Sequence, residues 1–314
     1  MDSTGAVWLP EAASTVAGEV DALFYFIFYA SLFFFVLVTS AMVYFAIRYR
    51  KRGKRVLTSS ISHNTALEVT WTVIPTILVF VIFIWGFKDF LNLHVVPRGA
   101  TEIKVTGQKW FWSFDYPEGL SVVNELTVPV NKPIKLLMAS KDVIHSFYVP
   151  SFRVKMDVVP NRYSIIWFEA TQTGEYNLFC TEFCGKGHSE MIGKVNVVTE
   201  EEYENWLLEN ADPSEGLTME EFGAKLYKSK ACVTCHTIDG TASQGPSLLG
   251  IYGKNEQLTD GSSVLVDENY LRESLLNPAA KIVKGYQPVM PPYQGLLNDK
   301  EVDALIAYIK SLSQ

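Results

Sequence analysis

The chain has 314 residues, of which 27 are basic, 34 are acidic and 48% are hydrophobic. This length suggests about two domains, and the many charged residues exclude a chain that is buried in a membrane throughout. The net charge of −7 argues against general nucleic-acid binding, which needs an excess of Lys and Arg facing phosphate, and four cysteines are too few for a disulfide-dense scaffold.

Two uncharged, strongly apolar stretches lie near the N-terminus, at residues 22–47 and 69–87. As helices they would be about 39 Å and about 28 Å long, enough to cross the hydrocarbon core of a bilayer. A signal peptide is the alternative for the first stretch. Its length, the lack of Lys or Arg before it and the lack of a small-residue cleavage site after it favour a membrane anchor.

The distribution of basic residues predicts the orientation of this hairpin. Residues 1–21 contain four acids and no Lys or Arg, whereas residues 48–55 contain six basic residues. By the positive-inside rule the connector is cytoplasmic, so both termini and everything after the second span lie outside. A nucleic-acid patch is the other interpretation of the basic run, and its position between two spans disfavours it.

The pattern after the hairpin changes from strands to helices. Several short β-rich or alternating runs between residues 101 and 200 are separated by Pro, Asn and Gly, which predicts a β-sandwich or barrel. Residues 201–217 contain six acids and no base and predict a short helix and a linker. Residues 218–314 are helical at both ends, and Asn298 with Glu301 forms a capping-box pattern before the last helix. The predicted segments are 1–97, 98–200, 201–217 and 218–314.

A Cys-x-x-Cys-His motif lies in the last segment, at Cys232, Cys235 and His236. This spacing is typical of c-type haem attachment, with two thioether bonds and an imidazole for the iron. A redox dithiol is the alternative, but it would be expected in a βαβ context. Met290, in a Pro-bounded loop, is the best candidate for the second axial ligand, and Met219 is the alternative.

A second cluster of donors lies upstream, with two thiols, an imidazole and a thioether within 12 residues: Cys180, Cys184, His188 and Met191. Soft sulfur ligands with imidazole select copper or zinc. A further histidine is needed, and His145 is the one left when His236 binds haem, His63 is cytoplasmic and His94 is at the membrane edge.

Three interpretations of this cluster remain open. Two bridged copper ions would use all five donors. A structural Cys₂His₂ zinc site would leave Met191 as ordinary packing. A disulfide here, with another in the Cys-x-x-Cys motif, would fit the oxidising side of the membrane.

At these residues the chain resembles subunit II of haem–copper cytochrome c oxidases, in the variant with a cytochrome c domain fused at the C-terminus. The resemblance covers nearly the whole chain and includes residues 68–75, 108–116, 142–146 and 155–162 and the Cys-x₃-Cys-x₃-His-x₂-Met cluster. It implies a multi-domain fold: a two-helix transmembrane hairpin, an all-β cupredoxin-like domain with a binuclear CuA centre, and an all-α class I cytochrome c domain.

The resemblance also implies roles for individual residues. Trp110 matches the aromatic residue at which electrons arrive, although Trp110 and Trp112 could simply pack on one face of a strand. Glu68 matches a residue near a proton path in subunit I, although it could be an ordinary helix-end charge. Glu182 would bind copper through its backbone carbonyl and a Mg²⁺ shared with subunit I through its side chain. The remaining implied copper ligands are His145, Cys180, Cys184, His188 and Met191.

The implied function is electron transfer in a respiratory cytochrome c oxidase. Electrons would pass from haem c to CuA and on to the haem of subunit I, where oxygen is reduced to water and protons are pumped. The implied partners are subunit I, other oxidase subunits and an upstream cytochrome c or quinol-oxidising complex, with both redox domains on the periplasmic side of a bacterial inner membrane. A reductase such as nitrous-oxide reductase and a membrane-anchored copper carrier are the alternatives.

Overall fold

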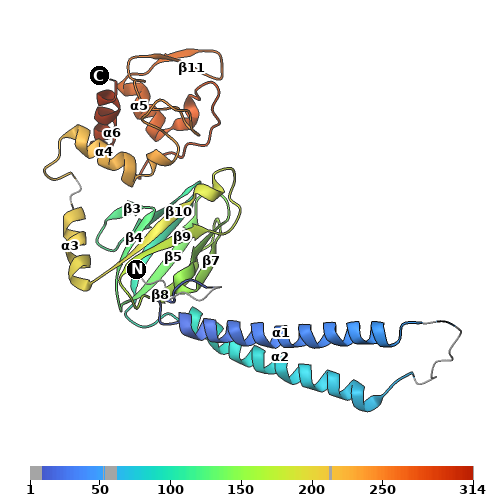
Figure 1. Cartoon of the computed structure of the whole chain (residues 1–314). Coiled ribbons are helices and arrows are strands. Elements are labelled where there is room, and N and C mark those ends of the chain that lie inside the picture. The colour runs from blue at the N-terminus through green and yellow to red at the C-terminus, as the bar shows by residue number, and fades with distance from the viewer. Residues whose placement is uncertain (1–8, 52, 54–61, 212–213, 314) are drawn as a thin grey trace.

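The computed structural model describes residues 9–51, 53, 62–211 and 214–313. In chain order it contains two long helices, a β-domain and a helical domain (Figure 1). The multi-domain fold that the sequence predicts is therefore confirmed. Arg52, Lys54 and Arg55 of the basic connector lie outside the described residues.

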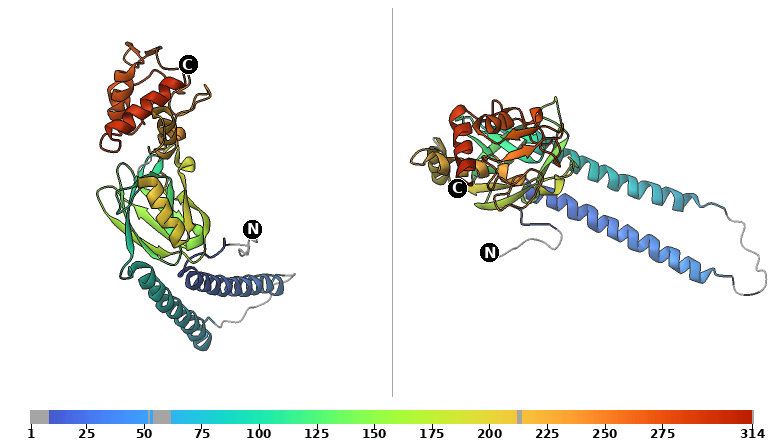
Figure 2. Two further views of the ribbon diagram at one scale, coloured as in Figure 1. Left: turned by 90° about the vertical axis from the view of Figure 1, so that its left-hand side faces the viewer. Right: turned by 90° about the horizontal axis from the view of Figure 1, so that it is seen from above.

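The two long helices are α1 (Ala17–Arg48) and α2 (Thr65–His94). Both are long and apolar enough to span a membrane, and the most apolar part of each is not buried in the protein. They contain the predicted spans and extend beyond them, because the prediction counted only uncharged residues and a helix tolerates charges near its ends. Figure 2 shows both helices projecting from one end of the β-domain.

The hairpin is tied to the β-domain by polar contacts at the end of the helices nearest that domain. The Arg153 guanidinium donates to both carboxylate oxygens of Asp21 in α1, at 2.7 and 2.9 Å. The Trp167 indole N–H donates to the carbonyl of Asn92 in α2. Just before α1, Ala13 is fully buried in the core of the β-domain. The sequence patterns had assigned this residue to the membrane segment. The core of the β-domain therefore includes residues from both before and after the hairpin.

The β-domain consists of two five-stranded sheets packed face to face, with strand orders β3-β2-β1-β5-β8 and β4-β10-β9-β6-β7. Alternating strand residues point inward, as in β5, and build an apolar core that includes Phe114, Leu136 and Phe147. The strands are β1 (Thr101–Gln108), β2 (Phe111–Asp115), β3 (Ser121–Val123), β4 (Glu125–Pro129), β5 (Pro133–Ser140), β6 (His145–Val149), β7 (Val154–Val158), β8 (Ser164–Glu169), β9 (Gly174–Cys180) and β10 (Ile192–Val198).

Helix α3 (Glu200–Ala211) follows the last strand and packs back on the β-domain. Trp206 of this helix contacts the ring of Tyr116 at a centroid distance of 5.1 Å, and the neighbouring Tyr203 is buried. Only residues 212–217 then connect α3 to the helical domain, which lies at the opposite end of the β-domain from the membrane helices (Figure 1).

The helical domain is built around a crossing of its first and last helices, α4 (Met219–Ser229) and α6 (Asp299–Ser311). Both helices begin with a capping box, and the predicted pairing of Asn298 with Glu301 is confirmed. The domain also contains α5 (Glu268–Leu276) and a short hairpin of β11 (Asn255–Gln257) and β12 (Ser263–Leu265).

Gly223 lets α4 and α6 approach closely. A Cβ at this position would lie 2.0 Å from the Ala304 carbonyl oxygen and 2.6 Å from Cβ of Tyr308, so the two backbones could not keep their present separation.

We therefore expect Gly223→Ala to destabilise the helical domain by about 1–3 kcal/mol, the usual cost of overpacking. Thermal unfolding of the full-length chain, followed by proteolysis of residues 218–314, measures the effect. Lys225→Ala, at an exposed position of the same helix, serves as the control and should be close to neutral. Equal stability of the two variants would contradict the packing assigned to this crossing.

Candidate functional site

The first donor cluster lies where three strands of one sheet begin or end. His145 is the first residue of β6, Cys180 is the last residue of β9, and Met191 directly precedes β10. Pairing of β6 with β9 puts Phe147 opposite Cys180, which brings His145 to the same end of the sheet. The loop between β9 and β10 carries Cys184 and His188. Strand register therefore joins residues that are up to 46 positions apart in the sequence.

The donor atoms of this cluster converge. The two thiol sulfurs, of Cys180 and Cys184, are 3.8 Å apart. Cys180 Sγ lies 3.9 Å from His145 Nδ1 and 3.3 Å from the Glu182 carbonyl oxygen. Cys184 Sγ lies 3.5 Å from His188 Nδ1 and 3.8 Å from Met191 Sδ. All six predicted donors thus meet at one place, and the sulfurs are too far apart for a disulfide, whose S–S bond is about 2 Å.

Asp142 holds the His145 ring in its orientation. Nε2 of His145 lies 2.8 Å from Asp142 Oδ1, which fixes the ring proton on Nε2 and leaves Nδ1 facing Cys180. The same carboxylate accepts the backbone N–H of Lys109 through Oδ2, at 2.8 Å. His145 is fully buried, so its ring has one fixed orientation before any metal binds.

The two thiols differ in acidity. Burial raises the pKa of Cys180, but contacts with His145 and with backbone groups of Ser146 and Glu182 outweigh it and lower the pKa to about 6. Burial and the neighbouring Cys180 raise the pKa of Cys184 to about 12. The pair therefore holds one thiolate beside one thiol at neutral pH, and a thiolate is the form that binds a metal.

The chemistry of this donor set fits copper. Two thiolates, two imidazoles, a thioether and a carbonyl exceed the four ligands of a tetrahedral zinc site. Met191 is 1% exposed with its sulfur turned toward Cys184, so it belongs to the cluster. Soft sulfur with imidazole is the set that copper prefers. Glu182 is exposed, and so is the next residue, Phe183, at 76%.

Trp110 lies against this cluster. Its indole N–H donates to the Cys184 carbonyl at 3.2 Å, and the side chain is only 4% exposed. Trp110 stands in the turn before β2, whereas Trp112 is within that strand and packs edge-on against His145. The expectation that both tryptophans share one strand was therefore wrong, because the strand begins one residue after Trp110.

The second cluster is the Cys-x-x-Cys-His motif, in a 3₁₀ turn (η3, Cys232–Thr234) after α4. The His236 ring is fixed from behind, because its Nδ1 lies 2.8 Å from the Pro246 carbonyl oxygen. The Tyr227 hydroxyl donates to the His236 carbonyl. A Cβ at Gly245 would lie 2.5 Å from Cε1 of His236, so a side chain there would displace the ring. Burial lowers the pKa of His236, which keeps its imidazole neutral and able to bind iron.

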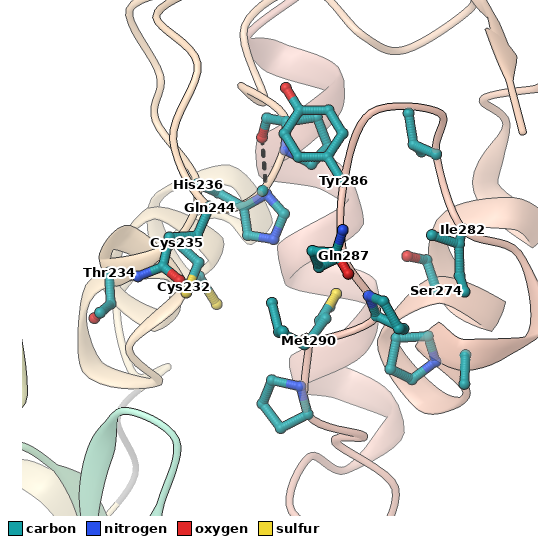
Figure 3. Close-up of a pocket in the computed structure, with 18 of the residues that line it drawn as sticks. Cys232, Thr234, Cys235, His236, Gln244, Ser274, Ile282, Tyr286, Gln287 and Met290 are labelled. Carbon is teal, nitrogen blue, oxygen red and sulfur yellow. Dashed lines mark hydrogen bonds between the residues drawn. The ribbon is translucent and has the colours of Figure 1, made fainter. Parts of the chain in front are cut away.

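A large cavity opens in front of His236. It has about 970 Å³ of empty space and is bordered by Cys232, Cys235, His236 and Met290. In Figure 3 the Met290 sulfur and the His236 ring face the same space, with both cysteines at one side. A cofactor held there would contact both cysteines and both candidate iron ligands. Met219 stands at the exposed start of α4 and does not border the cavity, so Met290 is the better of the two candidate ligands.

The acidity of these two thiols differs from that of a redox dithiol. Burial raises the pKa of Cys232 to about 12. Burial and the nearby Glu190 also raise the pKa of Cys235. A reactive Cys-x-x-Cys pair needs a lowered pKa, and the motif here follows a helix instead of standing in a βαβ unit. Thioether attachment of a cofactor fits these thiols better.

Glu68 serves a local structural purpose. It lies in the first turn of α2, and its carboxylate accepts the backbone N–H of Asn64 at 3.2 Å. The Asn64 side chain in turn accepts the Leu67 N–H. This reciprocal capping supports the interpretation of Glu68 as a helix-end charge.

Sequence reasoning missed the positioning residues of both clusters. Asp142 lies within residues 142–146, one of the segments that carry the family resemblance. A carboxylate three residues before a candidate ligand histidine was a signal that could have identified it. Pro246 acts through its backbone carbonyl, and Tyr227 through a hydroxyl that donates to the His236 carbonyl; neither contact leaves a local pattern in the sequence.

Comparisons with known proteins agree on the family. Family models for the transmembrane and periplasmic domains of cytochrome c oxidase subunit II match residues 3–88 and 118–198, and a cytochrome c model matches residues 221–313. Cytochrome c oxidase subunit 2 of Alkalihalophilus pseudofirmus is 31% identical over 274 residues, covering 84% of this chain and 78% of the relative. The subunit 2 of Synechocystis sp. is 30% identical over 260 residues, covering 67% of this chain and 78% of the relative.

A solved structure also matches part of the chain. The periplasmic domain of subunit II of cytochrome oxidase (CoxB) of Bradyrhizobium japonicum is 35% identical, covers 37% of this chain and 96% of its own length, and has a TM-score of 0.36.

The role of Asp142 can be tested by Asp142→Asn. The amide cannot replace the carboxylate between His145 and Lys109, so we expect copper affinity to fall roughly 10- to 100-fold, as for other residues that orient a metal ligand. Competition with a copper chelator measures this. Asp115→Asn is the control, because Asp115 accepts a hydrogen bond from the Ser121 hydroxyl and contacts none of the candidate metal ligands. Unchanged affinity in Asp142→Asn would contradict the orienting role.

Proposed function

Since the chain belongs to the cytochrome c oxidase subunit II family, with a cytochrome c domain at its C-terminus, we propose that it carries electrons from its haem c to a binuclear CuA centre and on to the haem of subunit I. Its family places it in a haem–copper oxidase, an oxidoreductase complex, and the matched domains imply copper and haem. In the proposed oxidase, subunit I reduces oxygen to water and pumps protons.

One observation carries the copper part of this proposal. The two thiol sulfurs lie 3.8 Å apart, and each is 3.5 to 3.9 Å from an imidazole nitrogen or the thioether sulfur. His145, Cys180, Cys184, His188, Met191 and the Glu182 carbonyl would hold the copper pair. The described chain keeps these donors on strand ends and in a short loop. Their positions need to change little on metal binding, which favours fast electron exchange.

The cavity of the helical domain supports the haem part. Cys232 and Cys235 would attach the haem through thioether bonds, and His236 and Met290 would bind its iron, with Met290 raising the potential. When bound, both groups supply one-electron redox chemistry. The chain itself fixes the His236 ring through Pro246, and the buried residues Tyr270 and Tyr293 line the cavity.

The remaining assignments follow the same proposal. The segments would be a membrane hairpin (1–97), a CuA domain (98–200), an acidic helix and linker (201–217) and a haem domain (218–314). The hairpin would lie in a bacterial inner membrane, with both redox domains and both termini on the periplasmic side. The exposed Glu182 side chain would bind Mg²⁺ with subunit I, and Glu68 would lie near a proton path. An upstream cytochrome c or a quinol-oxidising complex would supply electrons.

The copper assignment is tested by His188→Asn and Met191→Leu in the intact oxidase. Each change removes one donor, so the near-infrared copper band should be lost or altered and electrons should stop at the haem. Optical spectra and oxygen uptake measure both effects. Full copper absorption with normal turnover in both variants would refute the ligand assignment.

The haem assignment is tested by comparing two methionines. Met290→Leu should remove the sulfur ligand, convert the iron to a high-spin or vacant-site form and lower its potential, because Met ligation raises it. Met219→Leu should leave the haem spectrum unchanged. If Met219→Leu alters the spectrum and Met290→Leu does not, Met219 is the ligand.

A further inference from the structure

Arg153 occupies a backbone position that suits glycine. It follows the 3₁₀ turn η1 (Pro150–Phe152), which joins β6 to β7, and its φ of 57° lies in the left-handed region that costs energy for a residue with a Cβ atom. Phe152 of the turn is fully buried against Phe168 and Tyr176, with ring centroids 4.9 Å away, so core packing fixes the turn. An arginine in such a place indicates that its side chain has a purpose.

The Arg153 guanidinium has a partner for each of its three nitrogen atoms. Nε and Nη2 donate to the two carboxylate oxygens of Asp21 in α1. Nη2 also donates to the Pro10 carbonyl at 2.7 Å, and Nη1 donates to the Pro150 carbonyl at 2.6 Å. Only 7% of the Arg153 side chain is exposed. A two-point pairing of arginine with a carboxylate fixes orientation as well as distance, so this side chain joins η1 firmly to α1.

The residues before α1, 10–16, form a strap across the β-domain, here named the N-terminal strap. Its contacts reach η1 on one side and the chain at and after the end of β8 on the other. They are hydrogen bonds of 2.8–3.0 Å from Ala13 N–H to the Ser151 carbonyl, from the Ser14 hydroxyl to the Phe152 carbonyl, from Thr15 N–H to the Glu169 carbonyl and from Thr171 N–H to the Ala13 carbonyl. Arg153 binds the chain on either side of these contacts, at Pro10 and at Asp21, and so closes the strap.

The turn η1 lies at the far end of the strands that carry a candidate copper ligand. His145 begins β6, and η1 directly follows its last residue, Val149. β7 runs back beside β6 and pairs Val154 with Val149 and Val158 with His145. A five-residue strand is about 17 Å long. This strand pair therefore transmits any movement of η1 relative to α1 to the candidate copper ligands.

The ties from the β-domain to the two membrane helices differ in strength. Trp167 donates one hydrogen bond, between neutral groups, to the Asn92 carbonyl of α2 at 3.1 Å. Arg153 binds a carboxylate of α1 at two points, and hydrogen bonds between charged groups are stronger. A single bond at α2 leaves the β-domain free to pivot about that point, so the tie to α1 sets its tilt.

We propose that Arg153 is a positioning residue for electron transfer out of the copper domain: it holds the N-terminal strap and α1 on η1, and so fixes the height and tilt of the candidate copper ligands above the membrane hairpin. This inference rests on the proposed function. In that function one electron leaves the copper pair, which is oxidised, and reduces the haem of subunit I. Because the rate of such a step falls steeply with distance, a β-domain held at one height and tilt transfers electrons at one rate.

Hydrogen–deuterium exchange of the full-length chain, read by mass spectrometry over the N-terminal strap, tests the clasp without relying on redox activity. Arg153→Gly removes the guanidinium but keeps the turn, because glycine adopts a φ of 57° freely. Loss of hydrogen bonds to a charged group should speed exchange of the Ala13 and Thr15 amides roughly 10- to 100-fold. Amides of β10, within the β-domain, are the internal reference and should not change.

Matched variants separate the clasp from general damage. Asp21→Asn breaks the same pair from α1 and should speed the same amides, and combining it with Arg153→Gly should add little, because both changes remove one interaction. Arg153→Lys keeps the charge without the two-point pairing and should give an intermediate rate. Glu19→Gln, also in α1, leaves the clasp intact and keeps an acceptor for the Asn92 amide, so it should not change exchange.

A second readout separates positioning from stability. After photoreduction of haem c in the intact oxidase, the haem c to copper phase should be unchanged in Arg153→Gly, because the clasp holds neither of these sites relative to the other. The copper to subunit I phase should slow and spread over several rates, and Arg153→Lys should recover part of the loss. The copper absorption band should stay the same in all variants.

Unchanged strap exchange in Arg153→Gly would overturn the clasp. Faster exchange with both electron-transfer phases unaltered would show that Arg153 only stabilises the fold, and would overturn its positioning role. Copper that stays oxidised in the unaltered oxidase would refute the proposed function itself, and the exchange result would still decide whether the clasp exists.

Discussion

The position of Trp110 is the constraint on which the proposed electron route depends. Its indole N–H is bonded to the Cys184 carbonyl, and its ring borders the cavity of the helical domain. The loop that carries Cys184 has glycine at 187 because the ring and the partner domain leave no room for a side chain there. One buried side chain thus touches the copper-binding loop and the haem cavity together, and the proposed electron route needs no diffusing step between them.

The candidate ligands on both sides of Trp110 are held rigidly by the fold. Asp142 connects the His145 ring to the backbone N–H of Lys109, the residue before Trp110. On the other side, Pro246 fixes the His236 ring. Ligands held by the fold before metal or haem binds lose little freedom on binding and move little when an electron arrives. Strand register and hydrogen bonds to backbone groups therefore fix the ligand side chains of both clusters in place.

The sequence was sufficient for the fold class and for naming candidate donors that the structure brings together, and insufficient for the contacts between domains. The uncharged runs, the alternating strands and the cysteine spacings are local patterns, so periodicity and spacing identify them directly. The burial of Ala13 in the β-domain and the pairing of Gln244 with Glu190 join residues far apart in the chain, and no local pattern encodes them. The placing of Trp110 outside the strand of Trp112 depends on where β2 begins, and strand ends are poorly defined by propensity.

The most direct measurement is the rate of electron transfer from haem to copper in the intact oxidase after rapid photoreduction of the haem. A chain whose domains are held together at Trp110 predicts a single first-order phase whose rate is independent of protein concentration and of solvent viscosity. A rate that falls in proportion to viscosity, or that rises with protein concentration, would show that the domains must first find each other and would contradict the account.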